Sequence, residues 1–365
     1  MNENMLTKFD HYLAADGPAA LVIREPLVPA EGPDAVFFPA TYAEIGYNID
    51  GRNRFDDPSA QNIALVDSVG SQANRIEPLF TEGAYAKLVP QIVIVIKAGE
   101  KTVNLLDAGH RAGDAIVRCS TLHNELQAAF KTLLKGDAVP LAKIAPTSLV
   151  FGVWDSRDTQ AKLPRLIASV VRAYNVRKLK RSATYIAPVD CTAKGLVFAE
   201  GLISAEDAEK ASKDGKNPLS QTGLVNALAN ETHGGVIADG GIRRDATLAL
   251  SALKLLKGGT QENTLKLRRY ILGLSLVAFT RLPRGYYRQG TILVGATDDK
   301  GEPLPPTFEE VAINGKRTPV KINADDALAY AQAAAAVFGV GQGKEVPFDA
   351  TEAKKAIAEA KKKKS

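Results

Sequence analysis

Cysteine, histidine and tryptophan are scarce in this chain of 365 residues. Its two cysteines, Cys119 and Cys191, are too few for a disulfide scaffold or a cysteine-based zinc site, and its four histidines show neither an HExxH motif nor His/Cys metal spacing. The longest strongly apolar run, residues 271–279, is too short to cross a bilayer, and the polar N-terminus does not resemble a signal peptide. We therefore expect a cytoplasmic protein with no metal, no cofactor and no membrane contact.

Positive charge is only mildly in excess. Lys and Arg number 46 against 41 acidic residues, which gives a net charge of +5 and a pI near 9.0. This balance permits a polyanionic partner without requiring one, so the distribution of the charges matters more than their sum. The chain is also longer than a single core usually supports, and we expect one large domain with insertions or a core with lobes.

The most informative stretch is residues 66–77, which read VDSVGSQANRIE. Helical periodicity places its apolar residues on one stripe and uncharged hydrogen-bonding groups around a single arginine on another. Asp67 could cap this helix and Pro78 would end it. Such a stripe suits phosphate, sugar and base contacts, and the alternative is that it packs against another part of the chain. The stripe consists of Ser68, Ser71, Gln72 and Arg75.

The predicted elements mix short strands and helices without regular βαβ spacing, which favours an α+β fold with helices on one face of a mostly antiparallel sheet. Strands are predicted at 21–28, 148–154 and 291–294, a hairpin at 91–108, and helices at 115–133, 162–175, 245–256 and 265–279.

Two segments fall outside this pattern. Residues 30–59 form a long Gly/Pro/Asp/Asn-rich excursion whose tyrosines, arginines and Phe55 are atypical of disorder, so a functional loop is expected. The tail from Thr351 holds six lysines against two glutamates and could form a marginal helix or a frayed basic arm, which solvation alone explains.

Basic residues cluster in two segments that also contain tyrosine. Residues 172–181 carry five positive charges and no acid, and residues 281–288 carry three. Arginine and tyrosine together suit phosphate binding and base stacking in single-stranded nucleic acid, whereas solvated surface loops are the plainer alternative. The candidate contacts here are Arg177, Lys178, Lys180, Arg181, Arg281, Arg284, Tyr286 and Arg288.

Further candidates stand near glycines or helix starts. His110, Arg111 and Arg118 surround a predicted helix start, although an ordinary loop histidine is as plausible. Trp154 is expected in the core, and Arg157 after it is the better contact. Arg243 and Arg244 follow a Gly-rich turn. Lys266, Arg268 and Arg269 occupy the first turns of a helix, where positive charge opposes the macrodipole and an anionic partner would relieve the conflict.

Several motifs, taken in order, resemble the RAMP-superfamily backbone subunit of type I CRISPR effector complexes (Cascade), in the subtype G form formerly called U. They span roughly residues 20–295 and read VDSVGSQANRIE, HRAGDAIVR, LVFGVWDSR, KRSATYIAPVD, GGVIADGGIRRD and LRRYILGLSLVAFT.

The resemblance implies a modified RNA-recognition or ferredoxin-like palm with inserted thumb- and finger-like elements. It places the palm in residues 1–295, with 30–59 as a candidate thumb or wedge loop, followed by a C-terminal extension at 296–350 and the Lys-rich tail at 351–365. The positions that match its motifs and also look suited to RNA are Ser68, Ser71, Gln72, Asn74, Arg75, Arg111, Arg157, Lys180, Arg181, Arg243 and Arg244.

The implied function is that of a non-enzymatic antiviral-defence subunit. Several copies would line up head to tail along a CRISPR guide RNA, contact the other subunits of the complex, and present the guide for pairing with a target DNA strand. Two alternatives stay open. A RAMP-superfamily endoribonuclease would need an acid/base pair, for which His110 with Asp107 or Asp114 is the nearest arrangement. A small-molecule α/β enzyme would need a polar pocket that no motif identifies.

Overall fold

The computed structural model describes most of the chain. The described residues are 3–97, 100–189, 201, 204, 206, 222–224, 226–281 and 285–362. Within these ranges, no helix combines the length and the apolar character that a membrane crossing requires.

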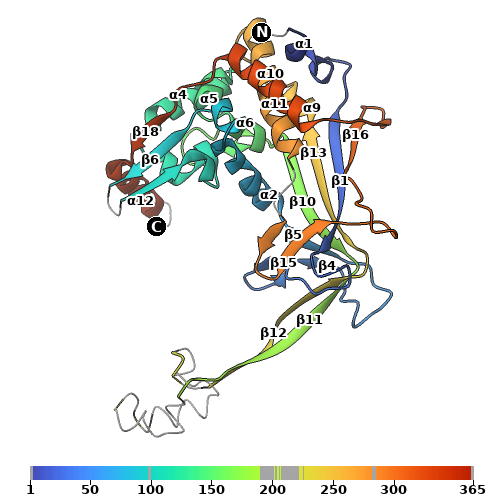
Figure 1. Cartoon of the computed structure of the whole chain (residues 1–365). Coiled ribbons are helices and arrows are strands. Elements are labelled where there is room, and N and C mark those ends of the chain that lie inside the picture. The colour runs from blue at the N-terminus through green and yellow to red at the C-terminus, as the bar shows by residue number, and fades with distance from the viewer. Residues whose placement is uncertain are drawn as a thin grey trace.

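A nine-stranded sheet forms the centre of the molecule (Figure 1), and its strand pairs are antiparallel. The main path runs β14-β15-β1-β13-β10-β5-β4, and β16 adds to β1 with β17 beyond it. The strands are β1 Ala20–Pro29, β4 Ile49–Asp50, β5 Ile63–Asp67, β10 Ile167–Tyr174, β13 Ile242–Ala249, β14 Tyr286–Arg288, β15 Thr291–Gly295, β16 Thr307–Val311 and β17 Arg317–Pro319.

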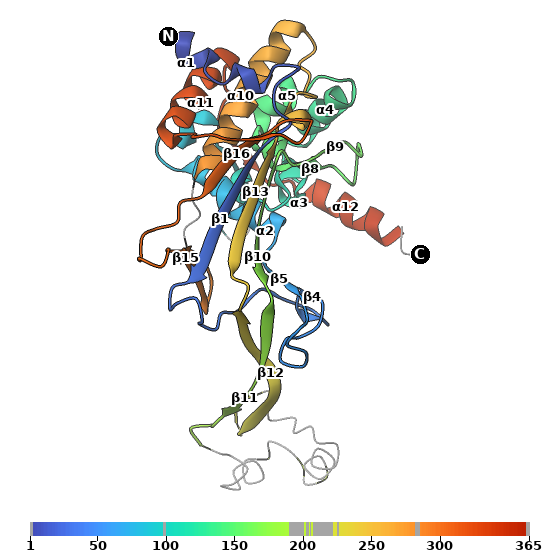
Figure 2. The ribbon, with the colours of Figure 1, turned by 90° about the vertical axis from the view of Figure 1, so that its right-hand side faces the viewer.

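Alternating burial gives this sheet two different faces. Along β13, Ile242, Arg244, Ala246 and Leu248 are buried, whereas the residues between them are partly exposed. The central strands β1, β13 and β10 lie in front of the helices when the right-hand side of Figure 1 faces the viewer (Figure 2). Helices therefore cover one face of the sheet, as the α+β prediction requires.

The covering helices are built around α10, Gln261–Thr280, which is apolar nearly all round and supplies much of the core. Gly273 lets α11 approach closely, because a Cβ there would stand 2.8 Å from the Cα of Ala331. The other helices near the sheet are α1 Glu3–Thr7, α2 Val69–Ile76, α6 Thr147–Phe151, α9 Leu250–Leu253 and α11 Ala324–Phe338.

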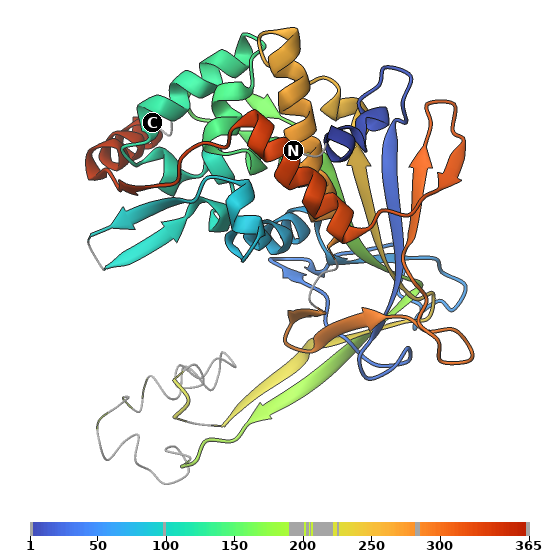
Figure 3. The ribbon, with the colours of Figure 1, turned by 45° about the horizontal axis from the view of Figure 1, so that its top comes forward.

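A helical lobe adjoins this layer and contains a small sheet of its own, in which β18 runs parallel to β6 and β7 antiparallel to it. Figure 3 shows the lobe beside α10 and α11. Its elements are β6 Ile92–Ile96, β7 Lys101–Asn104, α3 Ala115–Arg118, α4 His123–Leu134, α5 Val139–Ile144, β8 Val153–Trp154, β9 Lys162–Leu163, β18 Lys344–Pro347 and α12 Ala350–Lys362. Short 3-10 turns are η1 Asp10–Tyr12, η2 Glu77–Thr81, η3 Tyr85–Leu88, η4 Leu105–Asp107 and η5 Arg111–Gly113.

A two-stranded arm leaves the sheet on the same side as the helical lobe (Figures 1 and 3). It consists of β11, Val176–Tyr185, and β12, Ala227–Ala238, paired antiparallel. The strands β10 and β13 are neighbours in the sheet. The chain runs from β10 directly into β11, and it returns from β12 into β13. Where the arm joins the sheet, Asn175 (φ 51°) and Gly241 (φ 78°) have the left-handed backbone conformation.

Several sequence predictions are confirmed: the strands at 21–28 and 291–294, the hairpin at 91–108 and the buried helix at 265–279. The predicted helix at 115–133 is wrong as one element, because the chain breaks between α3 and α4. There the backbone of Cys119 and Thr121 hydrogen-bonds to the chain around Phe348 instead of continuing the helix. Tertiary pairing thus overrides the local periodicity.

Three further predictions are wrong. Residues 148–154 are mostly α6, residues 162–175 contain the strand β10, and residues 245–256 are mainly the end of β13 followed by the short α9. In β10 the neighbours Val170 and Val171 are both buried, so the alternation typical of a half-exposed strand is missing. In α6 every residue is buried, which leaves no polar face to reveal a helix.

Candidate nucleic-acid interface

The helix predicted at 66–77 exists as α2, but its polar stripe is hydrogen-bonded to its own chain. Ser68, not Asp67, caps the helix, and its side chain accepts a hydrogen bond from the amide of Ser71 at 3.2 Å. Asp67 ends β5 and is fully buried, and its carboxylate accepts from Ser71 Oγ at 2.8 Å and from Gln72 Nε2 at 2.6 Å. Gln72 also accepts from Ser169 at 2.9 Å. The stripe therefore holds α2 against the sheet.

Two arginines share the same carboxylate. Arg75 Nε and Arg288 Nη2 each lie 3.1 Å from an oxygen of Asp67. Arg75 also donates to the carbonyl of Tyr287 at 2.6 Å and lies over its ring, while Arg288 donates to the carbonyl of Val66 at 3.0 Å. Burial lowers the pKa of the Arg288 guanidinium, which Asp67 partly offsets. Two guanidiniums around one carboxylate leave a surplus positive charge beside α2.

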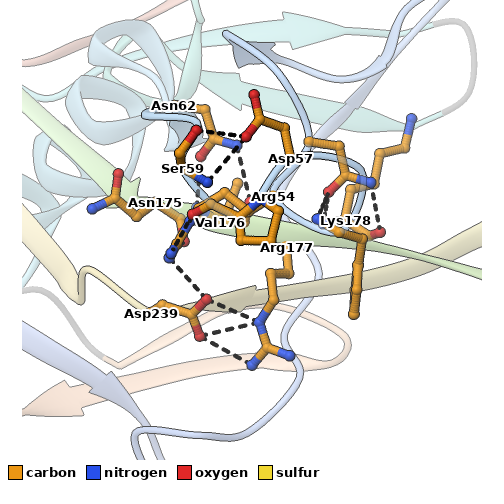
Figure 4. Close-up of polar contacts among 12 residues, drawn as sticks. Arg54, Asp57, Ser59, Asn62, Asn175, Val176, Arg177, Lys178 and Asp239 are labelled. Atoms are coloured by element: carbon orange, nitrogen blue, oxygen red, sulfur yellow. Dashed lines mark hydrogen bonds and ion pairs between the residues drawn. The ribbon is translucent and has the colours of Figure 1, made fainter.

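The arm is braced at its base by the loop of residues 51–62 (Figure 4). The buried Asn62 side chain donates to the carbonyl of Val176 at 2.9 Å and accepts from its amide at 2.6 Å. Asp239 follows β12 at the root of the arm. Its carboxylate accepts hydrogen bonds from Arg54 at 3.0 Å and from both Nε and Nη2 of Arg177. Much of the 30–59 excursion thus lies at the root of the arm, including β2 Thr41–Tyr42 and β3 Gly46–Tyr47.

Further along the arm, three basic residues follow one another on β11. Lys178 is partly exposed, Lys180 lies 3.3 Å from Glu231, and Arg181 lies over the ring of Phe38. Among the described residues, Lys178 and Arg181 have no carboxylate partner. The predicted cluster at 172–181 is therefore real in space, but it lies on a strand pair and not in a loop.

The exposed apolar residues of the arm gather towards its far end. Tyr185 is 48% exposed, and Ile186 and Leu228 are each 75% exposed. A two-stranded ribbon buries little surface of its own, so these side chains find little cover among the described residues.

Some predicted contact residues have structural roles. Arg111 is buried and pairs with Glu77 at 2.7 Å, and burial, opposed by Arg111, raises the pKa of Glu77 to about 7. Arg244 is buried and pairs with Glu25, its direct neighbour across β1 and β13. Neither guanidinium can reach a ligand without leaving a buried carboxylate unpaired.

The conflict expected at the start of α10 is resolved within the chain. Lys266 pairs with Glu262 at 2.5 Å, Arg269 pairs with Asp10 at 2.5 Å, and Arg268 donates to the carbonyl of Leu256 at 2.9 Å. An anionic partner is not required there.

The remaining predicted residues lie on several separate surfaces. Tyr286 and Asn74 are exposed near α2, and Arg281 lies over the ring of Tyr85. Arg118 lies 3.6 Å from Asp158, and Arg243 donates to Asp245. His110 and Arg157 are exposed in the helical lobe, and Arg284 lies outside the described residues.

Two features escaped the sequence analysis. The register places Arg172 directly opposite Arg243 on the less buried face of the sheet, although Arg172 belonged to the recognised basic segment. Trp154 is 55% exposed and is not in the core. Its place at the end of a very short strand gave no periodicity from which its exposure could have been predicted.

Comparison with known families bears on residues 21–178, the stretch from β1 into the first residues of the arm. This stretch matches the family model of CRISPR-associated protein GSU0053. No curated protein matches the chain. The matched stretch includes α2, the bracing loop and most of the helical lobe, and over this stretch the resemblance to a CRISPR-associated family is confirmed.

Proposed function

We propose that this chain, a member of that CRISPR-associated family through residues 21–178, is the guide-binding backbone subunit of a type I interference complex. In this proposal several copies line up along one CRISPR RNA, hold its sugar-phosphate backbone and leave its bases free to pair with target DNA. The guide RNA, neighbouring copies and the other subunits of the complex are the partners.

The arm is the observation that carries the proposal. It extends from the sheet on the side where α2 and the helical lobe lie (Figure 1), and it combines unpaired cations with exposed apolar residues. Phosphates would neutralise Lys178 and Arg181, and the apolar end would be covered by a neighbouring copy or inserted beside the RNA. We therefore assign the wedge role to β11 and β12 in place of residues 30–59.

The surplus charge of Arg75 and Arg288 supports the same placement. Their shared carboxylate, Asp67, neutralises only one of the two guanidiniums, and about a third of the Arg75 side chain stays exposed. A phosphate beside α2 would balance the second charge. The RNA would then pass between α2 and the arm.

We further propose that the subunit catalyses no reaction. The acid/base arrangement nominated from the sequence lies on an open surface, because the His110 side chain is 87% exposed and its Nδ1 is 3.4 Å from Asp114. Such an arrangement lacks the enclosure by which active sites perturb pKa values and exclude water.

RNA-dependent assembly tests the proposal. Native mass measurements on guides of graded length should show more subunits on longer guides, since a head-to-tail array does not close on itself. Replacing Lys178, Lys180 and Arg181 together by Ala should weaken assembly. The matched control replaces three exposed lysines elsewhere, Lys300, Lys316 and Lys321, by Ala, with circular dichroism as the folding check. A fixed mass on all guide lengths, or normal assembly by the arm variant, contradicts the proposal.

A further inference from the structure

The hairpin formed by β8 and β9 exposes the only tryptophan of the chain. Trp154 pairs directly with Lys162 across the two strands, and the Lys162 ammonium lies 5.3 Å from the ring centroid. The side chain nevertheless remains 55% exposed. An aromatic of this size normally contributes its area to a core or an interface, so its exposure marks a binding surface.

The acidic residues of this hairpin are already partnered. Asp155 is buried and accepts hydrogen bonds from the Thr159 amide and hydroxyl at 2.8 and 2.7 Å. Asp158 lies 3.6 Å from Arg118 and accepts from Gln127 at 3.2 Å. The carboxylates of the hairpin are thus unavailable to neutralise its own cations.

The basic residues of the same hairpin are exposed. Arg157 and Lys162 have no carboxylate partner among the described residues. Arg165 donates from Nε to the carbonyl of Phe151 at 3.1 Å, and its Nη2 reaches towards α2, 3.8 Å from the position a Cβ of Gly70 would take. Lys162 therefore lies beside the exposed indole, Arg157 follows it by three residues in the connection between β8 and β9, and Arg165 lies close to the start of α2.

We propose that Trp154 stacks on an unpaired base of a single-stranded nucleic acid, while Lys162, Arg157 and Arg165 bind the phosphates beside it. Stacking on an aromatic flanked by cations is the usual way of holding unpaired nucleotides without reading their sequence. A duplex would present phosphates but no free base face. The inference rests on the proposed function only in that the ligand is a nucleic acid, and the strand is either the guide RNA or a DNA strand with unpaired bases.

The fluorescence of the single tryptophan reports on this site directly. Titration of the full chain with single-stranded RNA and single-stranded DNA oligonucleotides should quench Trp154 emission, whereas polyglutamate and inorganic polyphosphate should leave it unchanged. Quenching by the guide alone identifies the guide as the ligand, and quenching only after addition of complementary or displaced DNA identifies the DNA strand. Equal quenching by polyglutamate would overturn the proposal in favour of an acidic protein partner.

Variants separate stacking from charge. Trp154→Ala should lower affinity for a fluorescently labelled strand at least about fivefold, and Trp154→Phe should lower it less, since phenylalanine retains a stacking face. Ile313→Ala, at an apolar residue that is also exposed, is the matched control and should bind normally. Because Trp154 is exposed, both variants should fold, which circular dichroism verifies.

The outcomes distinguish this inference from the proposed function. Normal RNA binding by anisotropy with Trp154 emission that neither RNA nor DNA changes, or wild-type affinity of Trp154→Ala for both kinds of strand, overturns the stacking site and leaves the backbone function intact. Absence of RNA binding in every measurement overturns both.

Discussion

The Asp67 carboxylate lies 3.1 Å from the Nε of Arg75, and this ion pair joins the polar stripe of α2 to the end of β5. The same carboxylate holds Arg288 from β14, so a single buried acid joins β5, α2 and β14. The polar groups of α2 that the sequence suggested for RNA binding are therefore mostly bonded to the chain itself. Stability and RNA binding can be tested separately.

Asp67→Asn should destabilise the protein by about 3–5 kcal/mol, because it leaves two partly buried guanidiniums without their counter-charge. Urea unfolding measures the effect. Asp298→Asn, at an exposed turn whose carboxylate accepts only backbone hydrogen bonds, should cost less than about 1 kcal/mol. A loss of similar size in both variants would show that Asp67 does not anchor α2.

Asn62→Ala should loosen the root of the arm without unfolding the sheet. The change removes the side-chain acceptor of the Val176 amide and a donor to the Val176 carbonyl, at a local cost of about 1–3 kcal/mol. Hydrogen exchange should therefore speed up at the first amides of β11 and not in β13. The control is Asn314→Ala, which removes a comparable acceptor in an exposed turn. Unchanged protection of the Val176 amide would exclude a bracing role.

RNA affinity should fall steeply as salt concentration rises, because the proposed contacts are cations to phosphates. Each lost phosphate contact should reduce the slope of log K against log salt by about 0.7 for a single strand. Lys178→Ala and Arg181→Ala should each show this reduction, and Lys300→Ala should not. A wild-type slope near zero would rule out the electrostatic model.

Acidification should weaken the β8–β9 hairpin only at low pH. Burial raises the pKa of Asp155, but hydrogen bonds from Thr159, Gln127 and the Asp158 amide outweigh it and hold the pKa below its ordinary value of 3.8. A lowered folded-state pKa means that this stabilisation is complete above pH 3.8 and is lost as pH falls through the lower, folded value. Urea midpoints at pH 6, 4 and 3, read from Trp154 emission, measure it. Asp155→Asn should remove that part of the pH dependence, and an unchanged profile in this variant would assign it to another acid.

Labelled guide and target strands incubated with the protein and Mg²⁺ or Mn²⁺ should stay intact, since the proposed role is binding. The matched variant is His110→Ala, at the only position for which an acid/base role was nominated. Products made by the wild type and lost in His110→Ala would instead support the endoribonuclease alternative.

Patterns that repeat with a clear period were predictable. The residues of α10 are apolar nearly all round, β1 alternates, and the 91–108 hairpin has two strand-forming runs around a turn, so each signal is local. The errors fall where a segment is buried on both sides, as in α6 and β10, or where a distant strand captures the backbone, as at Cys119. In those places the local sequence pattern does not show which other segment of the chain packs against it.

For the candidate site, the chemistry could be predicted from the residues alone: the motifs that resemble a CRISPR-associated family, the basic segments, and the uncharged residues around Arg75. Which of these groups remain available depends on how the chain folds. Arg111 and Arg244 are unavailable because they pair with Glu77 and Glu25 in the interior. Trp154 is exposed because the hairpin of β8 and β9 projects from the lobe (Figure 2). The physical reason is that a side chain's exposure depends on residues brought next to it from distant parts of the chain, and no spacing along the sequence specifies those neighbours.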